Sequence, residues 1–129
     1  MTQATQNSNI ATQRNIWALD SATARHGNIE VVIIGAVNFQ TGQVLWNPYK
    51  KLTAYSVCHF LDFAIVNWGL PSLLRTDNSS LFFDAKFKVF LQKRGINLEL
   101  TRSSYGGRDD LERELGEIAN KYVEIQAGA

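Results

Sequence analysis

The fold is decided by residues 68–78, which read Trp68-Gly69-Leu70-Pro71-Ser72-Leu73-Leu74-Arg75-Thr76-Asp77-Asn78. Glycine commonly terminates a helix and proline cannot continue one, so Gly69 and Pro71 end the helix that precedes them. A short apolar run follows and stops at Asp77. The stretch therefore predicts a helix, a tight connection and a strand with a carboxylate at its end.

The residues before this stretch predict a meander and the start of the helix. Three β-branched or aromatic runs, at residues 16–20, 29–37 and 43–46, are separated by turns containing Gly and Asn. Thr53 is expected to cap a helix whose apolar residues recur at helical spacing as far as Trp68. Three strands joined in series thus precede the first helix of the core.

That helix has more apolar residues than one buried stripe needs. Phe60, Phe63 and Val66 lie off the stripe. An apolar surface of this kind indicates either a subunit interface or burial by other elements of the same chain. The pattern leaves both interpretations open.

The residues after Asp77 alternate between helix and strand. Asp84 begins a second helix that Gly95 ends, residues 96–100 alternate as a fifth strand, and Asp109 or Asp110 begins a last helix. The order is strand, strand, strand, helix, strand, helix, strand, helix. We therefore predict an α/β fold, with a five-stranded mixed sheet and helices on both faces, which is the order of the ribonuclease H-like fold.

Composition indicates one globular domain. Apolar residues make up 45% of the 129 residues and charged residues 19%, a balance typical of a packed core. Residues 1–14 are polar without an apolar period and are expected to form a flexible arm or linker. We assign residues 15–125 to the core and 126–129 to a tail. No apolar stretch is long enough to span a membrane, so no membrane partner is expected.

The formal net charge of +1 gives no general attraction to nucleic acid. DNA binding would require local basic clusters, such as Lys50-Lys51, Lys93-Arg94 and residues 102–108, or additional domains. Taken one at a time, such clusters are more often ordinary solvated surface. A zinc site is not expected, because the single cysteine, Cys58, has no histidine at a recognised spacing.

Three acidic residues lie at positions where folding alone explains an acidic side chain poorly. Asp20 ends or interrupts a buried strand, Asp77 closes another, and Glu112 lies about 76° from the middle of the last helix's apolar stripe. One carboxylate from each of three elements supplies the hard oxygen ligands that magnesium or manganese prefers. Taken singly, each also has an ordinary explanation, as a turn, cap or surface acid.

Residues 15–122 resemble the catalytic core of retroviral-type DNA integrases and transposases. The resemblance begins with residues 68–78, which are similar to the segment around that family's second catalytic aspartate. It continues in further segments in the family's order: Trp17-Ala18-Leu19-Asp20, Thr41-Gly42, Phe82 or Phe83, Phe90-Leu91, Gly95-Ile96 and Leu111-Glu112-Arg113. The resemblance implies that Asp20, Asp77 and Glu112 are catalytic and bind metal.

Two residues near these acids, Glu114 and Asn78, each have two possible roles. Glu114 fits the family's spacing from Asp77 as well as Glu112 does, and Glu112 is preferred because Arg113 follows it as in the family. Asn78 is expected either to orient DNA or the second carboxylate, or to form a turn. Ser79 departs from the glycine usual after the family's Thr-Asp-Asn.

The resemblance implies a metal-dependent DNA strand-transfer enzyme. Mg²⁺ or Mn²⁺ would serve as cofactor, and water or a DNA 3′-hydroxyl would attack the phosphate. DNA is the expected partner, together with further copies of the chain in a dimer or higher homo-oligomer. The alternatives are a hydrolytic ribonuclease H-like nuclease and a catalytically decayed module for DNA binding or oligomerisation. The expected location is the cytoplasm of a bacterial host, or intracellular or nuclear for a eukaryotic element.

Overall fold

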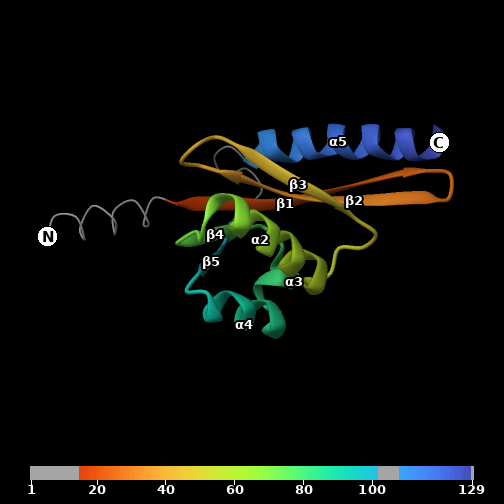
Figure 1. Ribbon diagram of the computed structural model, residues 1–129. Helices are drawn as coiled ribbons and strands as arrows, with labels where there is room; N and C mark the ends of the chain where they lie inside the picture. The colour runs from red at the N-terminus through yellow and green to blue at the C-terminus, as the bar shows by residue number, and fades with distance from the viewer. Residues whose placement is uncertain (1–14, 102–107, 129) are drawn as a thin grey trace, which may run out of the picture.

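The chain folds as strands and helices in the order that the sequence predicts, with one short helix added. The computed structural model describes residues 15–101 and 108–128, so the arm expected at residues 1–14 lies outside the described residues. The elements are β1 (Ile16–His26), β2 (Ile29–Asn38), β3 (Val44–Tyr49), α2 (Ala54–Trp68), β4 (Leu73–Thr76), α3 (Ser79–Phe82), α4 (Ala85–Lys93), β5 (Asn97–Leu100) and α5 (Arg108–Gly128). The added element is α3, a single turn between β4 and α4 (Figure 1).

The described strands form one five-stranded mixed sheet in the order β3-β2-β1-β4-β5. β1 and β2 pair antiparallel, as do β2 and β3, which confirms the predicted meander. β4 pairs with β1 in parallel, and β5 pairs with β4 in parallel. The central position of β1 brings Asp20 next to the strand that ends before Asp77.

Helices cover both faces of the sheet, as predicted (Figure 1). Among the described helices, α5 packs on one face, where Leu111, Leu115, Ala119 and Val123 are buried against β1 and β2. α2, α3 and α4 cover the other face, over a larger core that includes Trp17 of β1. Because side chains alternate along a strand, odd-numbered residues of β1 such as Trp17 and Leu19 point toward α2, and even-numbered ones point toward α5.

Helix α2 begins and ends at the residues that the sequence predicts. The Thr53 hydroxyl accepts a hydrogen bond from the Ser56 backbone N–H at 3.0 Å, and the Ser56 hydroxyl accepts one from the Thr53 N–H at 2.9 Å. Gly69 follows the helix with a φ of 78°, in the region that glycine adopts without strain. The residues that lie off the predicted apolar stripe of α2 differ in burial. Phe60 is fully buried in the core, whereas Val66 is 86% exposed.

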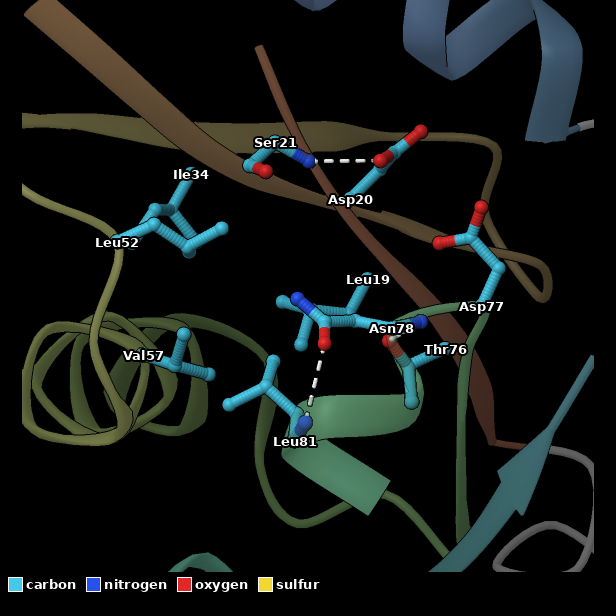
Figure 2. A pocket seen from close by; sticks show the side chains of 10 residues that line it. All are labelled: Leu19, Asp20, Ser21, Ile34, Leu52, Val57, Thr76, Asp77, Asn78 and Leu81. Atoms are coloured by element: carbon cyan, nitrogen blue, oxygen red, sulfur yellow. Dashed lines mark hydrogen bonds between the residues drawn. The ribbon is translucent and has the colours of Figure 1, made fainter. Parts of the chain in front are cut away.

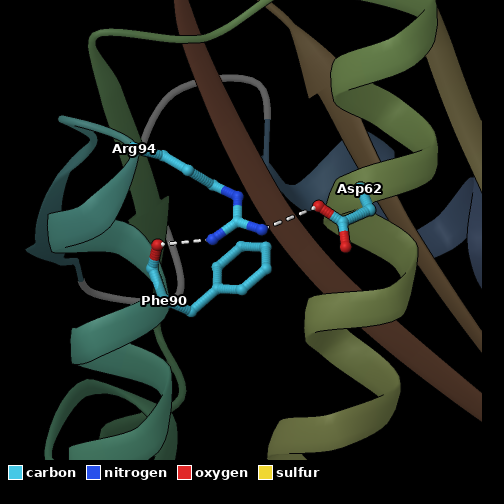
Figure 3. Close-up of polar contacts among 3 residues, drawn as sticks. All are labelled: Asp62, Phe90 and Arg94. Atoms are coloured by element: carbon cyan, nitrogen blue, oxygen red, sulfur yellow. Dashed lines mark hydrogen bonds and ion pairs between the residues drawn. The ribbon is translucent and has the colours of Figure 1, made fainter.

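A cluster of three side chains ties α4 to α2 (Figure 3). The Arg94 guanidinium donates to the Phe90 backbone carbonyl at 3.0 Å and pairs with the Asp62 carboxylate of α2 at 3.3 Å. The guanidinium carbon also lies 3.6 Å from the centre of the Phe90 ring, within the range of a cation–π contact. This cluster holds α4 against α2 at the surface.

Several element boundaries differ from the sequence-based prediction, among them the ends of β1 and α5. β1 continues to His26, past the run expected at residues 16–20, so that of the two positions considered for Asp20 the one inside the strand is observed. α5 continues to Gly128, past the core boundary expected at residue 125. No described helix combines the length and the apolar character that crossing a membrane requires.

Candidate metal and catalytic site

Strand register brings Asp20 and Asp77 to the same place on the sheet. β1 and β4 run parallel, with Ala18 opposite Arg75. Asp20 lies two residues after Ala18, and Asp77 lies two residues after Arg75. The two aspartates therefore reach the same level and point to the same face. That face is the one covered by α5. Two carboxylates distant in sequence thus become neighbours because β4 pairs with β1.

Both carboxylates border one pocket (Figure 2). The Asp20 Oδ1 atom accepts a hydrogen bond from the Ser21 backbone N–H at 2.8 Å, which fixes the orientation of that carboxyl group. Asp77 is exposed, whereas Asp20 is partly buried. The pocket is lined by Leu19, Asp20, Ser21, Ile34, Leu52, Val57, Thr76, Asp77, Asn78 and Leu81. Its lining is thus mixed, with polar side chains from β1 and from the end of β4 beside apolar ones from the core.

The connection after β4 is shaped by Thr76 and Asn78. The buried Thr76 hydroxyl accepts a hydrogen bond from the Asn78 backbone N–H at 3.1 Å. The Asn78 Oδ1 atom accepts one from the Leu81 backbone N–H at 3.0 Å, so Asn78 caps α3. Of its two predicted roles, the structure supports the turn-forming one, because capping already occupies its side-chain oxygen. The two hydrogen bonds bracket Asp77 between an anchored strand end and a capped helix.

Helix α5 approaches the sheet closely beside Asp20. Gly35 of β2 is opposite Asp20, and a Cβ atom built on Gly35 would lie 2.6 Å from the Leu115 Cδ2 atom. Glycine at position 35 is therefore what lets Leu115 touch the strand. Glu112 precedes Leu115 by one helical turn and so lies on the neighbouring part of the same side of α5. A glycine inside an otherwise β-branched strand was the sequence signal for this close approach, and sequence reasoning missed it.

The structure brings Asp20 and Asp77 together but does not bring Glu112 to them. Glu112 and Glu114 are both exposed on the first turns of α5. Within residues 15–101 and 108–128, no three Asp, Glu, His or Cys side chains are close enough to hold a metal ion. The geometry that is present is a pair of carboxylates, with the two glutamates on the helix that covers the same face.

The chemistry of the pair fits a hard divalent cation. The carboxylates of Asp20 and Asp77 offer oxygen atoms, and neither histidine nor cysteine lines the pocket. Magnesium and manganese prefer such ligands, whereas structural zinc sites are built mainly from cysteine and histidine.

Solved structures that resemble this chain are retroviral integrase catalytic cores. The HTLV-2 integrase catalytic core domain in complex with magnesium matches in its dimeric form with a TM-score of 0.62 and 23% identity, over 67% of this chain and 60% of that chain. Its trimeric form matches with a TM-score of 0.63 and 23% identity, over 68% and 60%. A simian T-cell lymphotropic virus intasome in complex with PP2A regulatory subunit B56 gamma matches with a TM-score of 0.66 and 21% identity, over 77% and 38%.

Comparison of sequences alone finds no match for this chain. No protein-family profile matches the chain, and no curated protein matches it in sequence. The matching region spans 60% of the length of each HTLV-2 integrase core chain. At identities below 25% the likeness concerns the fold, and the fold of this chain is the ribonuclease H-like fold of retroviral integrase catalytic cores.

Proposed function

We propose that this chain is the catalytic core of a metal-dependent DNA strand-transfer enzyme, an integrase or transposase. The observation that carries the proposal is the position of Asp20, in β1, and Asp77, directly after the parallel neighbour β4, at the edge of one pocket. The fold is shared with integrase cores, one of which is described in complex with magnesium. The site and the fold support the same chemistry independently.

Each acidic residue has a distinct part in the proposed reaction. When bound, Mg²⁺ or Mn²⁺ supplies positive charge beside the attacking and leaving oxygens of the phosphate. Asp20 is held in place by the Ser21 N–H and contributes a fixed carboxylate. Asp77 contributes a second carboxylate from the solvent side of the pocket. The attacking group is water or a DNA 3′-hydroxyl, so no side chain of the chain has to act as a nucleophile.

Glu112 is proposed as the third ligand. Its helix already packs on the face that Asp20 and Asp77 share, through Leu115 and Gly35. The proposal requires the exposed Glu112 side chain, on the first turns of α5, to turn toward the two aspartates. We expect Glu112 to move when a cation binds, because the cation then gains a third negatively charged oxygen donor.

The first experiment measures metal binding by thermal unfolding of the 129-residue chain. Adding MgCl₂ or MnCl₂ should raise the Tm, since a ligand that binds only the folded state stabilises it by about 2.7 kcal/mol at a concentration 100 times its Kd. Asp77→Asn should reduce that response while leaving the metal-free Tm equal or higher, because it removes a negative charge beside Asp20. Glu117→Gln, an exposed residue on α5, is the matched control and should respond like the wild type.

DNA products separate the remaining functions. A strand-transfer core should both nick DNA and join a 3′-hydroxyl end to a target strand in the presence of metal. A hydrolytic nuclease gives nicks without joined products, and a decayed module gives neither. An unchanged metal response in Asp77→Asn, or equal turnover per folded molecule, would refute the role proposed for Asp77.

A further inference from the structure

An exposed aromatic group stands one helical turn beyond the proposed catalytic site. The rings of Phe82 and Phe83 meet edge to face with centroids 5.0 Å apart. The Lys88 ammonium lies 5.2 Å from the Phe82 ring centre and 5.4 Å from that of Phe83. Phe83 is nevertheless 69% exposed, so its ring is held in place but not covered. We refer to Phe82, Phe83 and Lys88 as the aromatic platform.

The platform is connected to the site through α3. Leu81 of α3 and Asn78, which caps α3, line the pocket that Asp20 and Asp77 border. Phe82 is the last residue of α3, and Phe83 follows it directly. The four residues of α3 rise about 6 Å along the helix axis. The platform therefore lies one short helix away from the pocket.

Charge favours nucleic acid on this side of the molecule. Residues 79–93 contain three lysines and one aspartate, a formal excess of positive charge. Helix α5, on the opposite face, contains three basic and six acidic residues in its sequence, a formal excess of negative charge. The overall net charge of +1 thus hides an uneven distribution. The excess of positive charge in residues 79–93 favours a polyanion at α3 and α4.

We infer that the aromatic platform binds an unpaired DNA base next to the site, an inference that rests on the proposed function. An exposed phenyl ring offers a stacking surface to any base, because every base has a π face. The Lys88 ammonium, held over the rings, is placed to contact the phosphate that accompanies the base. A duplex cannot use the platform in this way, since its bases are already stacked on one another. The platform therefore selects DNA that is single-stranded or frayed at its end.

The test measures binding of a fluorescently labelled oligo(dT), about 10 nucleotides long, by anisotropy in a chelator without divalent metal. The wild type should bind with a Kd in the range of roughly 1–100 µM, and more tightly than it binds a duplex of equal length. Phe83→Leu removes the π face but keeps an apolar side chain, and it should weaken binding about ten-fold. Phe83→Tyr keeps the ring and should bind like the wild type.

Two further variants separate charge from stacking. Lys88→Gln should reduce the slope of log K against log salt by about 0.7, the value for one phosphate contact on a single strand. Val89→Ala is the matched control, because Val89 is a 47% exposed apolar residue of the same helix with no ring. It should leave both the Kd and the salt slope unchanged.

The outcomes decide between this inference and the alternatives. Equal Kd values for wild type and Phe83→Leu, tighter binding of duplex, or no oligo(dT) binding at about 100 µM protein would overturn it. Self-association that Phe83→Leu abolishes while oligo(dT) binding persists would mean that the platform contacts a second copy. The proposed function is tested separately, by the metal response of Asp77→Asn. The platform experiment contains a chelator and no divalent metal, so its result does not depend on metal binding at Asp20 and Asp77.

Discussion

Leu115 of α5 rests directly on the backbone of Gly35 in β2, opposite Asp20. A Cβ atom at position 35 would lie 2.6 Å from the Leu115 Cδ2 atom and 2.9 Å from the Leu45 backbone oxygen. The second neighbour is backbone of the paired strand and cannot move aside as a side chain can. The distance between α5 and the sheet at the level of the site is therefore set by the absence of one side chain.

Gly35→Ala should lower stability and weaken the metal response together. Overpacking of this kind costs about 1–3 kcal/mol, and it would push the part of α5 that includes Glu112 away from Asp20. Urea unfolding and metal-induced Tm shifts measure the two effects. Gly116→Ala is the matched control, because its Cβ meets nothing within 4 Å. It should raise the free energy of unfolding by about 0.5–1 kcal/mol, as expected for glycine replaced within a helix. A stable Gly35→Ala protein with a normal metal response would contradict the prediction.

Glu112→Gln and Glu114→Gln identify the third carboxylate. If Glu112 is the ligand, Glu112→Gln should lower metal affinity and abolish metal-dependent nicking, and Glu114→Gln should leave both unchanged. Neither variant should alter metal-free stability by more than about 0.5 kcal/mol, because both side chains are exposed. Isothermal titration with MnCl₂ gives the affinities. The reverse pattern would transfer the role to Glu114.

Thr53→Ala should destabilise the chain by about 1 kcal/mol through the loss of the cap of α2. The substitution frees the Ser56 backbone N–H from the Thr53 hydroxyl. Thr53→Ser retains that acceptor and should be close to wild type in chemical denaturation. If the two variants prove equally stable, the cap contributes nothing measurable.

Cys58 should alkylate slowly at neutral pH and faster only under alkaline conditions. Burial raises the pKa of the Cys58 thiol above its ordinary value, Asp62 raises it further, and Arg94 opposes the shift. Because the raised pKa belongs to the folded state, the associated stability is complete below the unfolded pKa and is lost as pH rises through the folded one. Iodoacetamide labelling rates against pH report the shift.

Asp62→Asn tests the electrostatic part of that shift. Removing the carboxylate should lower the pKa of Cys58 and speed its labelling at a fixed alkaline pH. The ion pair with Arg94 is also lost, but both partners are at the surface and stability should change by less than about 1 kcal/mol. A labelling profile identical to that of the wild type would leave burial as the sole cause.

The elements could be predicted where the sequence has a strong local pattern. Thr53 and Gly69 mark the ends of α2, and Asp84 caps α4, as predicted. β3 was predicted to end at Trp46 and instead continues to Tyr49 through Pro48. Proline is tolerated there because β3 is an edge strand, a position that depends on the order of the whole sheet.

The end of β1 was missed for a related reason. Residues 21–26 contain small and polar side chains that give only a weak strand pattern, and their pairing with β2 decides their conformation. Ala22 and Ala24 point toward α5, where small side chains let the helix lie close. The site itself depends on the register of β1 against β4, a pairing between distant segments. Local pattern could not supply that register, and the resemblance to integrase cores only indicated which acids to consider together.

Because β1 extends well past Asp20, the backbone holds Asp20 more firmly than Asp77. Asp20 lies within a continuous ladder, since β1 is paired with β2 on both sides of it, from Trp17 to His26. Asp77 lies just past the last residue of β4, on the connection to α3. Displacing Asp20 would require breaking interstrand hydrogen bonds, whereas Asp77 can shift by rotation of a short connection. The pocket is thus bordered by one anchored carboxylate and one adjustable carboxylate, and any change in their separation would be taken up at Asp77.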